Sequence, residues 1–277
     1  GAHIMTHPAF EAGNTAVVTG AALGIGHAAC LRFAAMGMNV CMVDIDGDAL
    51  EAARIEVADV ARSSVTRSVV DVGDSVAVAA LGKDVFAEFG RVDVLFNNAV
   101  TRVGGGVWGD ADEWRRSMYV NYWGPVNGVR VFVPQMIEQN SPGLVINAGS
   151  KQGITNPPGN AAYNVTKAAL KHYTESLQHE LRNTEKCQIS SHLLVPGWTR
   201  SEEEAQARGA WVPAQVVDFM MDALATGDFY IVCPDGETTA EMDKDRIRWA
   251  AGDVSENRPP LSRWHPDFKT AFESDSR

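Results

Sequence analysis

The 277-residue chain has few cysteines and no long apolar run, and both absences narrow the classes of protein it can belong to. The four cysteines are far apart in the sequence and form no C-x-x-C pair, which favours reduced, buried thiols in a cytoplasmic protein over a disulfide framework. No apolar segment approaches the roughly 18 residues that a membrane-spanning helix requires. We expect Gly1–Ile4 to be the remnant of a cleaved tag.

Positive charge is also scarce. The 24 Lys and Arg residues stand against 35 Asp and Glu residues, giving a formal net charge of −11, and no run of Lys or Arg offsets it. Such a surface repels nucleic-acid phosphates and anionic lipid headgroups. We therefore expect neither nucleic acid nor a membrane as a partner. The length and the 45% hydrophobic content suffice for one folded domain with its own core.

Short apolar segments alternate with longer amphipathic segments along most of the chain. Strands that are apolar throughout, separated by helices, are typical of a parallel sheet covered on both faces. The expected strands are Ala16–Thr19, Asn39–Val43, Val65–Val70, Val92–Asn97, Leu144–Ala148, Ile189–Val195 and Phe229–Cys233. The expected helices are Gly24–Met36, Asp48–Arg62, Ser75–Phe89, Asp112–Gln139 (with Pro134 bending its last turns) and Ala161–Arg182. We predict a single α/β domain over residues 5–277, a doubly wound parallel sheet of the Rossmann type in three α/β/α layers.

A glycine-rich turn, Thr19-Gly20-Ala21-Ala22-Leu23-Gly24-Ile25-Gly26, joins the first expected strand to the first helix. Any tight corner can require glycine, but this one lies where dinucleotide-binding folds place a pyrophosphate against a helix N-terminus. Asp44 ends the second strand, where a carboxylate can bind an adenosine ribose and would repel a 2′-phosphate. Because Leu23 supplies no cation, the two positions favour NAD over NADP. The alternative is that Asp44 only caps the next helix.

Four polar residues follow in the order Asn121, Ser150, Tyr163 and Lys167. Tyr163 and Lys167 are one helical turn apart, and Ser150 lies just beyond the strand Leu144–Ala148, at the edge where open parallel sheets bind ligands. Together with the glycine turn, these residues make the chain resemble the short-chain dehydrogenase/reductase family, of its compact single-domain type. Further elements that match in family order are Asp71-Val72, Asn97-Asn98-Ala99 and Pro196-Gly197.

The resemblance implies that these four residues form a catalytic tetrad. Tyr163 would exchange a proton with the substrate oxygen, and the ammonium of Lys167 would favour the tyrosinate and hold the nicotinamide ribose. Ser150 would donate a hydrogen bond to the substrate oxygen. Asn121 would fix a water that links Lys167 to solvent. The hydride chemistry belongs to the cofactor, so no metal is expected.

The resemblance also implies which residues hold NAD. The glycine turn would bind the pyrophosphate, Asp44 the adenosine ribose, residues 71–72 the adenine, residues 97–99 the nicotinamide ribose and Thr199 the carboxamide. The expected cofactor residues are Gly20, Leu23, Gly24, Ile25, Gly26, Asp44, Asp71, Val72, Asn97, Asn98, Ala99, Tyr163, Lys167, Pro196, Gly197 and Thr199. Val100 and Ser201 depart from the family pattern, which commonly has glycine and threonine at these positions.

We predict an NAD-dependent oxidoreductase that interconverts a secondary alcohol and its ketone, with a tyrosine as acid/base. Segment 198–226 would form a lid over the substrate, and the C-terminal extension 234–277 would pack against its own or a partner subunit. Trp198 and Trp211 in the lid and Trp264 in the extension suggest a bulky or aromatic alcohol. The alternatives are an NADP-dependent carbonyl reductase and a dinucleotide-binding sensor or scaffold without turnover. By analogy with relatives, we expect a homodimer or homotetramer in the cytoplasm.

Overall fold

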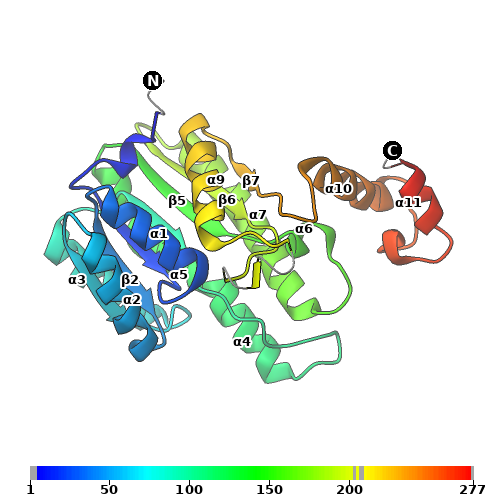
Figure 1. Ribbon diagram of the computed structural model, residues 1–277, viewed down its shortest axis with the longest axis horizontal. Helices are drawn as coiled ribbons and strands as arrows, with labels where there is room; N and C mark the ends of the chain where they lie inside the picture. The colour runs from blue at the N-terminus through cyan, green and yellow to red at the C-terminus, as the bar shows by residue number, and fades with distance from the viewer. Residues whose placement is uncertain (1–4, 202–203, 206–208, 276–277) are drawn as a thin grey trace.

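The computed structural model describes residues 5–201, 204–205 and 209–275, so the expected tag remnant at residues 1–4 lies outside the described residues. At its centre is a seven-stranded, all-parallel sheet in the order β3-β2-β1-β4-β5-β6-β7 (Figure 1). The strands are β1 Thr15–Thr19, β2 Asn39–Asp44, β3 Val65–Val69, β4 Val94–Asn97, β5 Gly143–Ala148, β6 Ile189–Val195 and β7 Tyr230–Val232. The order reverses between the neighbours β1 and β4, which is the point where ligands bind in such sheets.

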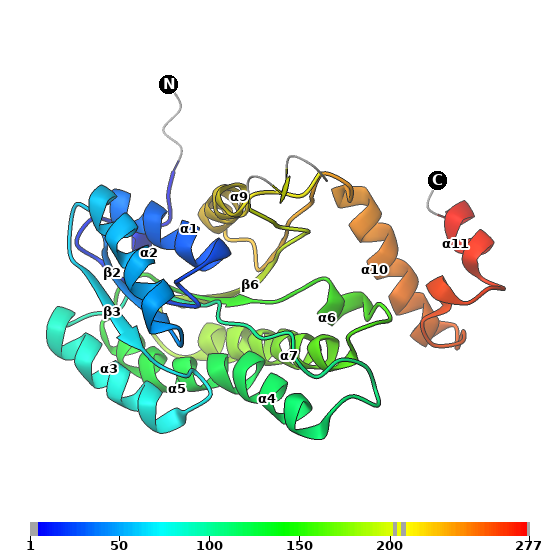
Figure 2. The ribbon, with the colours of Figure 1, turned by 60° about the horizontal axis from the view of Figure 1, so that its bottom comes forward.

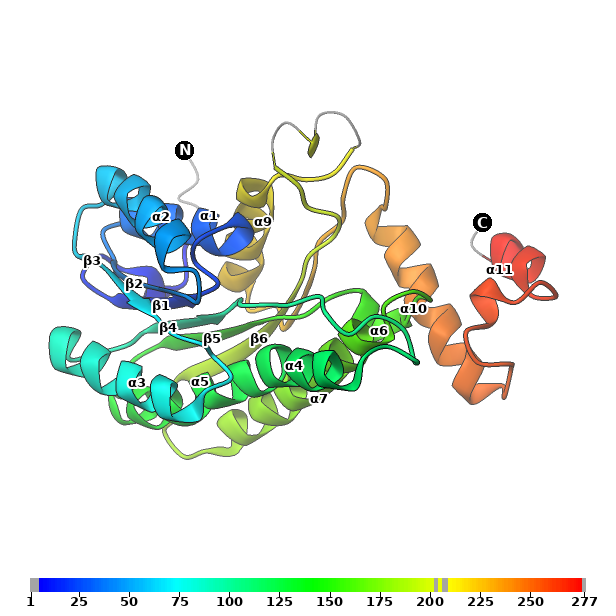
Figure 3. The ribbon, with the colours of Figure 1, turned by 90° about the horizontal axis from the view of Figure 1, so that it is seen from below.

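Helices cover both faces of this sheet, and Figure 3 shows the two layers from the side. One layer contains α1 Gly24–Ala35, α2 Gly47–Val60 and α9 Pro213–Thr226. The other contains α3 Ser75–Phe89, α4 Ala111–Asn121, α5 Trp123–Glu138 and α7 Ala161–Asn183. The predicted doubly wound α/β/α architecture is confirmed.

Two apolar cores lie on opposite faces of the sheet, because successive side chains of a strand point to opposite sides. Ala16 and Val18 of β1 belong to the core that includes Phe33 of α1, whereas Val17 belongs to the core that includes Phe132 of α5. All three β1 residues are fully buried. A strand buried on both faces has no polar side to expose, which explains why the middle of β1, Ala16–Val18, is apolar throughout.

The single helix expected over residues 112–139 is wrong, because the structure contains two helices that meet at Tyr122 (φ −105°, ψ −57°). Pro125, in the first turn of α5, has no N–H to donate to the carbonyl of Asn121 four residues earlier, and its ring crowds that carbonyl. Pro134 lies inside α5. The break therefore falls near Pro125, directly after the predicted catalytic residue Asn121.

The C-terminal segment leaves the sheet after β7 and projects from one end of the molecule (Figures 1 and 2). It consists of α10 Ala240–Ser255, the 3-10 turn η2 Ser262–Trp264 and α11 Lys269–Asp275. Its N-terminal part packs on the short helix α6 Gln152–Thr155, which follows β5. Trp249 of α10 is buried, and its indole N–H donates to Ser262 Oγ at 2.8 Å. In the part of the chain that the structure describes, no helix is both long and apolar enough to cross a membrane.

Candidate active site

A cavity of about 930 Å³ opens at the carboxyl edge of the sheet, between the turn after β1 and the first turns of α7. Several predicted residues line it: Gly24, Ile25, Asn98, Ser150, Tyr163, Lys167, Pro196, Gly197 and Thr199. The remaining predicted residues are not among those lining it: Gly20, Leu23, Gly26, Asp44, Asp71, Val72, Asn97, Ala99 and Asn121. The site thus brings together glycine turn, serine, tyrosine and lysine, while the second group lies around it.

The glycine turn ends where α1 begins, with Leu23 as an N-cap that makes no side-chain hydrogen bond to the helix. The first backbone N–H groups of α1 are therefore free of a side-chain cap, as an anion site at a helix N-terminus requires. A Cβ on Gly26 would lie 2.2 Å from the carbonyl oxygen of Gly20, so the turn closes only with glycine there. Gly24 has a φ of +57° and no atom within 4 Å of its virtual Cβ. Its open side at the cavity wall fits a dinucleotide phosphate.

Asn98 fastens this turn to the neighbouring strand end. Its side-chain Nδ2 donates to the carbonyls of Thr19 and Gly20, both at 3.2 Å. Thr19 Oγ1 in turn accepts from the backbone N–H groups of Asn98 at 2.9 Å and Ala99 at 3.1 Å. The expected motif at residues 97–99, at the end of β4, therefore shapes the turn after the neighbouring strand β1. Of its three residues, Asn98 lines the cavity.

Asp44 is the last residue of β2, and its carboxylate lies beside the glycine turn. Oδ2 accepts from the backbone N–H of Ala22 and Oδ1 from that of Asp46, each at 3.1 Å. The N-cap of α2 is Asp46, whose side chain accepts from Ala49 at 3.0 Å, so the alternative that Asp44 caps this helix is wrong. Leu23 is 74% exposed. The carboxylate is thus positioned next to the turn, with an uncharged neighbour.

Tyr163 and Lys167 project from the first turns of α7, whose N-cap Asn160 accepts from the backbone N–H of Tyr163 at 3.1 Å. They are only 4% and 2% exposed. Lys167 Nζ lies 5.7 Å from the Tyr163 ring centre and donates to the carbonyl of Ala148, the last residue of β5, at 2.6 Å. Burial, and next the cation of Arg102, lower the pKa of Lys167 to about 7. Both its protonation states are therefore accessible near neutral pH, whereas the sequence suggested a permanent ammonium.

Ser150 follows β5 by two residues and is half-buried at the cavity wall. Its hydroxyl oxygen accepts from the backbone N–H of Gln152 at 3.1 Å. This bond fixes the oxygen and leaves the hydroxyl hydrogen available to donate. The side chain can therefore donate to a substrate oxygen inside the cavity.

Asn121, the last residue of α4, is fully buried behind the cavity. Its Oδ1 accepts from the N–H of Thr101 at 2.8 Å, and its Nδ2 donates to the Thr101 carbonyl at 2.9 Å and to Thr166 Oγ1 at 3.1 Å. The side-chain amide thus ties the loop after β4 to α7. The backbone carbonyl of Asn121 lacks its usual donor because residue 125 is proline.

Three other predicted residues are engaged in structural contacts, Asp71 and Asn97 through their side chains and Val72 through its backbone carbonyl. Asp71 forms an ion pair with Arg116 at 2.7 Å and accepts from the N–H of Gly73 at 3.2 Å. The carbonyl of Val72 accepts from Asn127 Nδ2 at 2.9 Å. Asn97 is buried and donates to Asn147 Oδ1 at 2.9 Å. Contact of residues 71–72 with the adenine stays a prediction.

The expected lid, residues 198–226, follows Gly197, in a turn that Asp235 holds in place. Asp235 Oδ2 accepts from the backbone N–H of Trp198 at 2.9 Å, and a Cβ on Gly197 would lie 2.8 Å from the same oxygen. Thr199 pairs with Trp211 in an isolated parallel β-bridge, and its hydroxyl donates to the Gly197 carbonyl at 3.1 Å. Trp198 and Thr199 line the cavity. Residues 202–203 and 206–208 of the expected lid lie outside the described residues.

Sequence reasoning missed five polar residues of the cavity wall: His27, Arg102, Lys151, Gln152 and Arg200. The guanidinium of Arg102 lies 4.5 Å from the centre of the Tyr163 ring. Lys151 and Gln152 directly follow Ser150, and Arg102 follows the Asn-Asn-Ala motif closely, so adjacency to the motifs was the available signal. No acidic residue occurs among the described residues that line the cavity, although the whole chain carries a net charge of −11.

Comparison with known proteins agrees with this geometry. The short chain dehydrogenase family model matches residues 14–210. The chain is 34% identical over 232 residues to 1-deoxy-11-beta-hydroxypentalenate dehydrogenase of Streptomyces avermitilis, covering 79% of this chain and 83% of that one. It is 33% identical over 224 residues to 2-dehydro-3-deoxy-L-rhamnonate dehydrogenase (NAD(+)) of a Sphingomonas species, covering 80% and 84%. A short-chain dehydrogenase/reductase from Burkholderia phymatum, solved in complex with NAD, superposes with a TM-score of 0.80 at 29% identity, covering 91% and 97%.

The fold and the site define a nicotinamide-dependent oxidoreductase. The chain belongs to the short-chain dehydrogenase/reductase family. It is accordingly an NAD(P)-dependent enzyme that acts on CH–OH groups.

Proposed function

We propose that this enzyme interconverts a secondary alcohol and its ketone, with NAD as the hydride carrier. The observation that carries the proposal is the buried Tyr163–Lys167 pair, which shares one cavity with Ser150 and the glycine turn at Gly24. When bound, the nicotinamide accepts or donates the hydride. The protein has to hold the alcohol and move its proton.

Tyr163 is the acid/base of the proposal, and Ser150 fixes the substrate oxygen by donating its free hydroxyl hydrogen. Lys167 can take part in the same proton transfer, because its ammonium and amine forms are both accessible at a pKa of about 7. A buried lysine of this kind can pass on a proton that the tyrosine receives, whereas a lysine with its ordinary pKa would hold it. The guanidinium of Arg102 packs over the tyrosine ring, 4.5 Å from its centre.

Asn121 connects this proton path to solvent in the proposal. Its side chain is fully used by Thr101 and Thr166, so the group left to hold a water is its backbone carbonyl. The helix break caused by Pro125 exposes that carbonyl to a partner other than the helix. In the proposal, the main chain of Asn121 therefore fixes the water that the sequence led us to expect at this residue.

Asp44 supports NAD rather than NADP. Its carboxylate is held beside the glycine turn by two backbone N–H groups, and Leu23 next to it brings no positive charge. A 2′-phosphate on the adenosine ribose would meet this carboxylate without a compensating cation. The name of the Sphingomonas relative and the NAD complex of the Burkholderia structure support the same cofactor. Tighter binding of NADPH than of NADH would favour the alternative, an NADP-dependent carbonyl reductase.

The substrate of the proposal is bulky or aromatic. The cavity extends beyond the tetrad to Trp198 at the start of the lid, and aromatic walls suit apolar or aromatic ligands. We also propose a cytoplasmic homo-oligomer that associates through α4, α5 and α7. Trp123 on α5 and Val165 on α7 are 46% and 47% exposed, and burying such apolar side chains against a second copy of the chain would be favourable. Light scattering during gel filtration would measure the oligomeric state.

The decisive experiment follows NADH absorbance while a panel of cyclic and aryl secondary alcohols is oxidised with NAD. Tyr163→Phe should lower kcat by about 10²- to 10⁴-fold, because it removes the acid/base and leaves the ring in place. The NADH dissociation constant of this variant should stay within about threefold of the wild type, since the phenol oxygen contributes one bond at most. Full activity of Tyr163→Phe would contradict the mechanism. Binding of NADH without turnover of any alcohol would favour a sensor or scaffold.

A further inference from the structure

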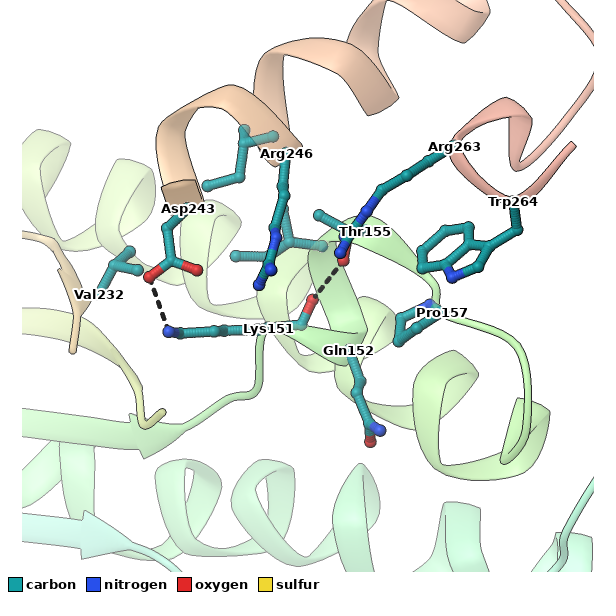
Figure 4. A pocket seen from close by; sticks show the side chains of 11 residues that line it. Lys151, Gln152, Thr155, Pro157, Val232, Asp243, Arg246, Arg263 and Trp264 are labelled. Atoms are coloured by element: carbon teal, nitrogen blue, oxygen red, sulfur yellow. Dashed lines mark hydrogen bonds and ion pairs between the residues drawn. The ribbon is translucent and has the colours of Figure 1, made fainter. Parts of the chain in front are cut away.

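A second cavity, of about 170 Å³, lies between α6 and the C-terminal segment (Figure 4). Lys151 and Gln152, directly after the catalytic Ser150, line both this cavity and the main one. The far wall is formed by α10 and η2, which the minimal Rossmann sheet does not include. The two cavities therefore adjoin at the substrate end of the active site.

The charges around this second cavity do not balance. Lys151 Nζ is paired with Asp243 Oδ2 of α10 at 2.6 Å, which neutralises both. Two further cations, Arg246 and Arg263, line the same cavity, and within the described residues neither forms an ion pair with an acidic side chain. Figure 4 shows both guanidinium groups directed toward the segment that carries Lys151 and Thr155. Lys151 Nζ also lies 3.9 Å from Asp235 Oδ2, so three cations face two carboxylates here and neither guanidinium is directly paired, in a protein of net charge −11.

These two arginines are held in place by neighbours that leave their charge unneutralised. The guanidinium of Arg263 lies 4.7 Å from the ring centre of Trp264, and Arg246 Nη1 donates a long bond of 3.4 Å to Thr238 Oγ1. Burial and the cation of Arg246 lower the pKa of Arg263, while Asp243 acts in the opposite direction. The two cations therefore repel one another across a half-buried space. An anion between them would relieve this repulsion.

The rest of the wall is apolar, and it restricts the kind of anion that fits. Ile154, Pro157, Val232 and Ile247 line the cavity, and Figure 4 shows the indole of Trp264 beside the ring of Pro157. A wider cavity of about 410 Å³ shares both arginines and the tryptophan and runs along α10. A guanidinium binds a carboxylate through two parallel N–H bonds. The apolar walls suit an acid group carried on an apolar body better than free phosphate, which has no apolar part.

We propose that Arg246 and Arg263 bind a carboxylate of the substrate, so that the enzyme acts on an apolar hydroxy acid whose acid group lies away from the reacting alcohol. The alcohol reaches Ser150 and Tyr163 in the main cavity, and the acid group reaches the arginine pair beyond Lys151. The inference rests on the proposed function for the identity of the reacting alcohol. The C-terminal extension then supplies the charge that selects the substrate.

The test first measures binding, which needs no turnover. The full-length enzyme with NADH is titrated calorimetrically with 3-phenylpropionate and with the uncharged 3-phenylpropionamide. The wild type should bind the acid at least tenfold more tightly than the amide, and the double variant Arg246→Gln/Arg263→Gln should bind both alike. Equal binding of acid and amide by the wild type would overturn the proposal, as would an unchanged preference in the double variant. Equal competition by inorganic phosphate would overturn the assignment to a carboxylate.

Arg248→Gln is the matched control. Arg248 lies on the same helix, is 73% exposed in its side chain, pairs with Asp245 at 3.7 Å and does not line the cavity. Its variant should keep the preference for the acid. All variants should bind NADH as the wild type does, which reports that they are folded and tests the cofactor site separately.

Kinetics then distinguish substrate from effector. The acid probe should inhibit alcohol oxidation competitively against the alcohol. The ratio of kcat/KM for hydroxy acids to kcat/KM for neutral alcohols should fall at least tenfold in the double variant. Inhibition that is not competitive with the alcohol would overturn the assignment to the substrate. If no alcohol is oxidised, the proposed function fails, and the acid-against-amide comparison still decides the arginine site.

Discussion

Gly24 allows binding of the cofactor and stability of the fold to be separated in one experiment. Its φ of +57° lies in the left-handed region, and a Cβ at this position would meet no atom within 4 Å. Gly24→Ala should therefore lower the free energy of unfolding by about 1 kcal/mol, the cost of a left-handed alanine, without a packing clash. The added methyl group would stand at the wall of the main cavity, where we place the pyrophosphate.

Gly90 provides the control because it also has a positive φ in the left-handed region but lies in a different place. It ends α3 with a φ of +71°, a Cβ there also meets no atom within 4 Å, and it does not line the cavity. Gly90→Ala should lose the same ~1 kcal/mol of stability. Urea unfolding of the apo proteins measures this loss, and quenching of protein fluorescence by NADH measures the dissociation constant.

The two variants should differ only in cofactor affinity. Gly24→Ala should weaken NADH binding by about tenfold or more, which corresponds to ~1.4 kcal/mol, and Gly90→Ala should leave it unchanged. Equal NADH affinity in both variants would refute the placement of the pyrophosphate at this helix N-terminus. A much larger loss of stability in Gly24→Ala than in Gly90→Ala would show that the space beside Gly24 is not open.

Three further outcomes test the site and the sheet. Since the pKa of Lys167 falls from 10.5 to about 7 on folding, the unfolded chain binds more protons between these values, and the free energy of unfolding should rise with pH from about 7 to 10. Lys167→Met should flatten this rise in urea unfolding at pH 7, 8 and 9, whereas Lys171→Met, one turn further along α7, should keep it. Asp44→Asn should shift the ratio of NADPH to NADH dissociation constants by about tenfold or more toward NADPH, and an unchanged ratio in fluorescence titrations would contradict the cofactor assignment. Asp93→Ala should cost about 3 kcal/mol in urea unfolding, because the fully buried carboxylate accepts from the backbone N–H of Thr15 at 2.8 Å; a loss below about 1 kcal/mol would exclude a structural role for this bond.

The sheet and most of its helices could be predicted because their signals are local. A strand such as β2 is apolar from Val40 to Val43, and short connections join it to α1 and α2, so the local pattern alone finds it. The helix break at Tyr122 was not predicted, because the sequence placed the bend at Pro134. The residue that removes the hydrogen bond to the Asn121 carbonyl is instead Pro125. A proline within the first turn of a helix can begin it or end the one before, and the sequence alone does not distinguish the two.

The C-terminal part of the site could not be predicted from the sequence. Arg246 and Arg263 are 17 positions apart in the sequence, and nothing local marks them as neighbours in space. Their meeting depends on how α10 docks, which the ion pair between Lys151 and Asp243 fixes across 92 positions of sequence. Contacts between residues so far apart in the sequence depend on tertiary packing, whereas the glycine turn and the Tyr-Lys pair are each contained within a few consecutive residues.

The main cavity has one more consequence, for the lifetime of the protein. Its walls follow β1, β4, β5 and β6, so a ligand there contacts segments from both sides of the point where the strand order reverses. A dinucleotide therefore acts as a reversible cross-link through the middle of the sheet, adding about 2.7 kcal/mol of stability when its concentration is 100 times the dissociation constant. The abundance of this enzyme should then follow the supply of its cofactor, with the empty form unfolding and being degraded first.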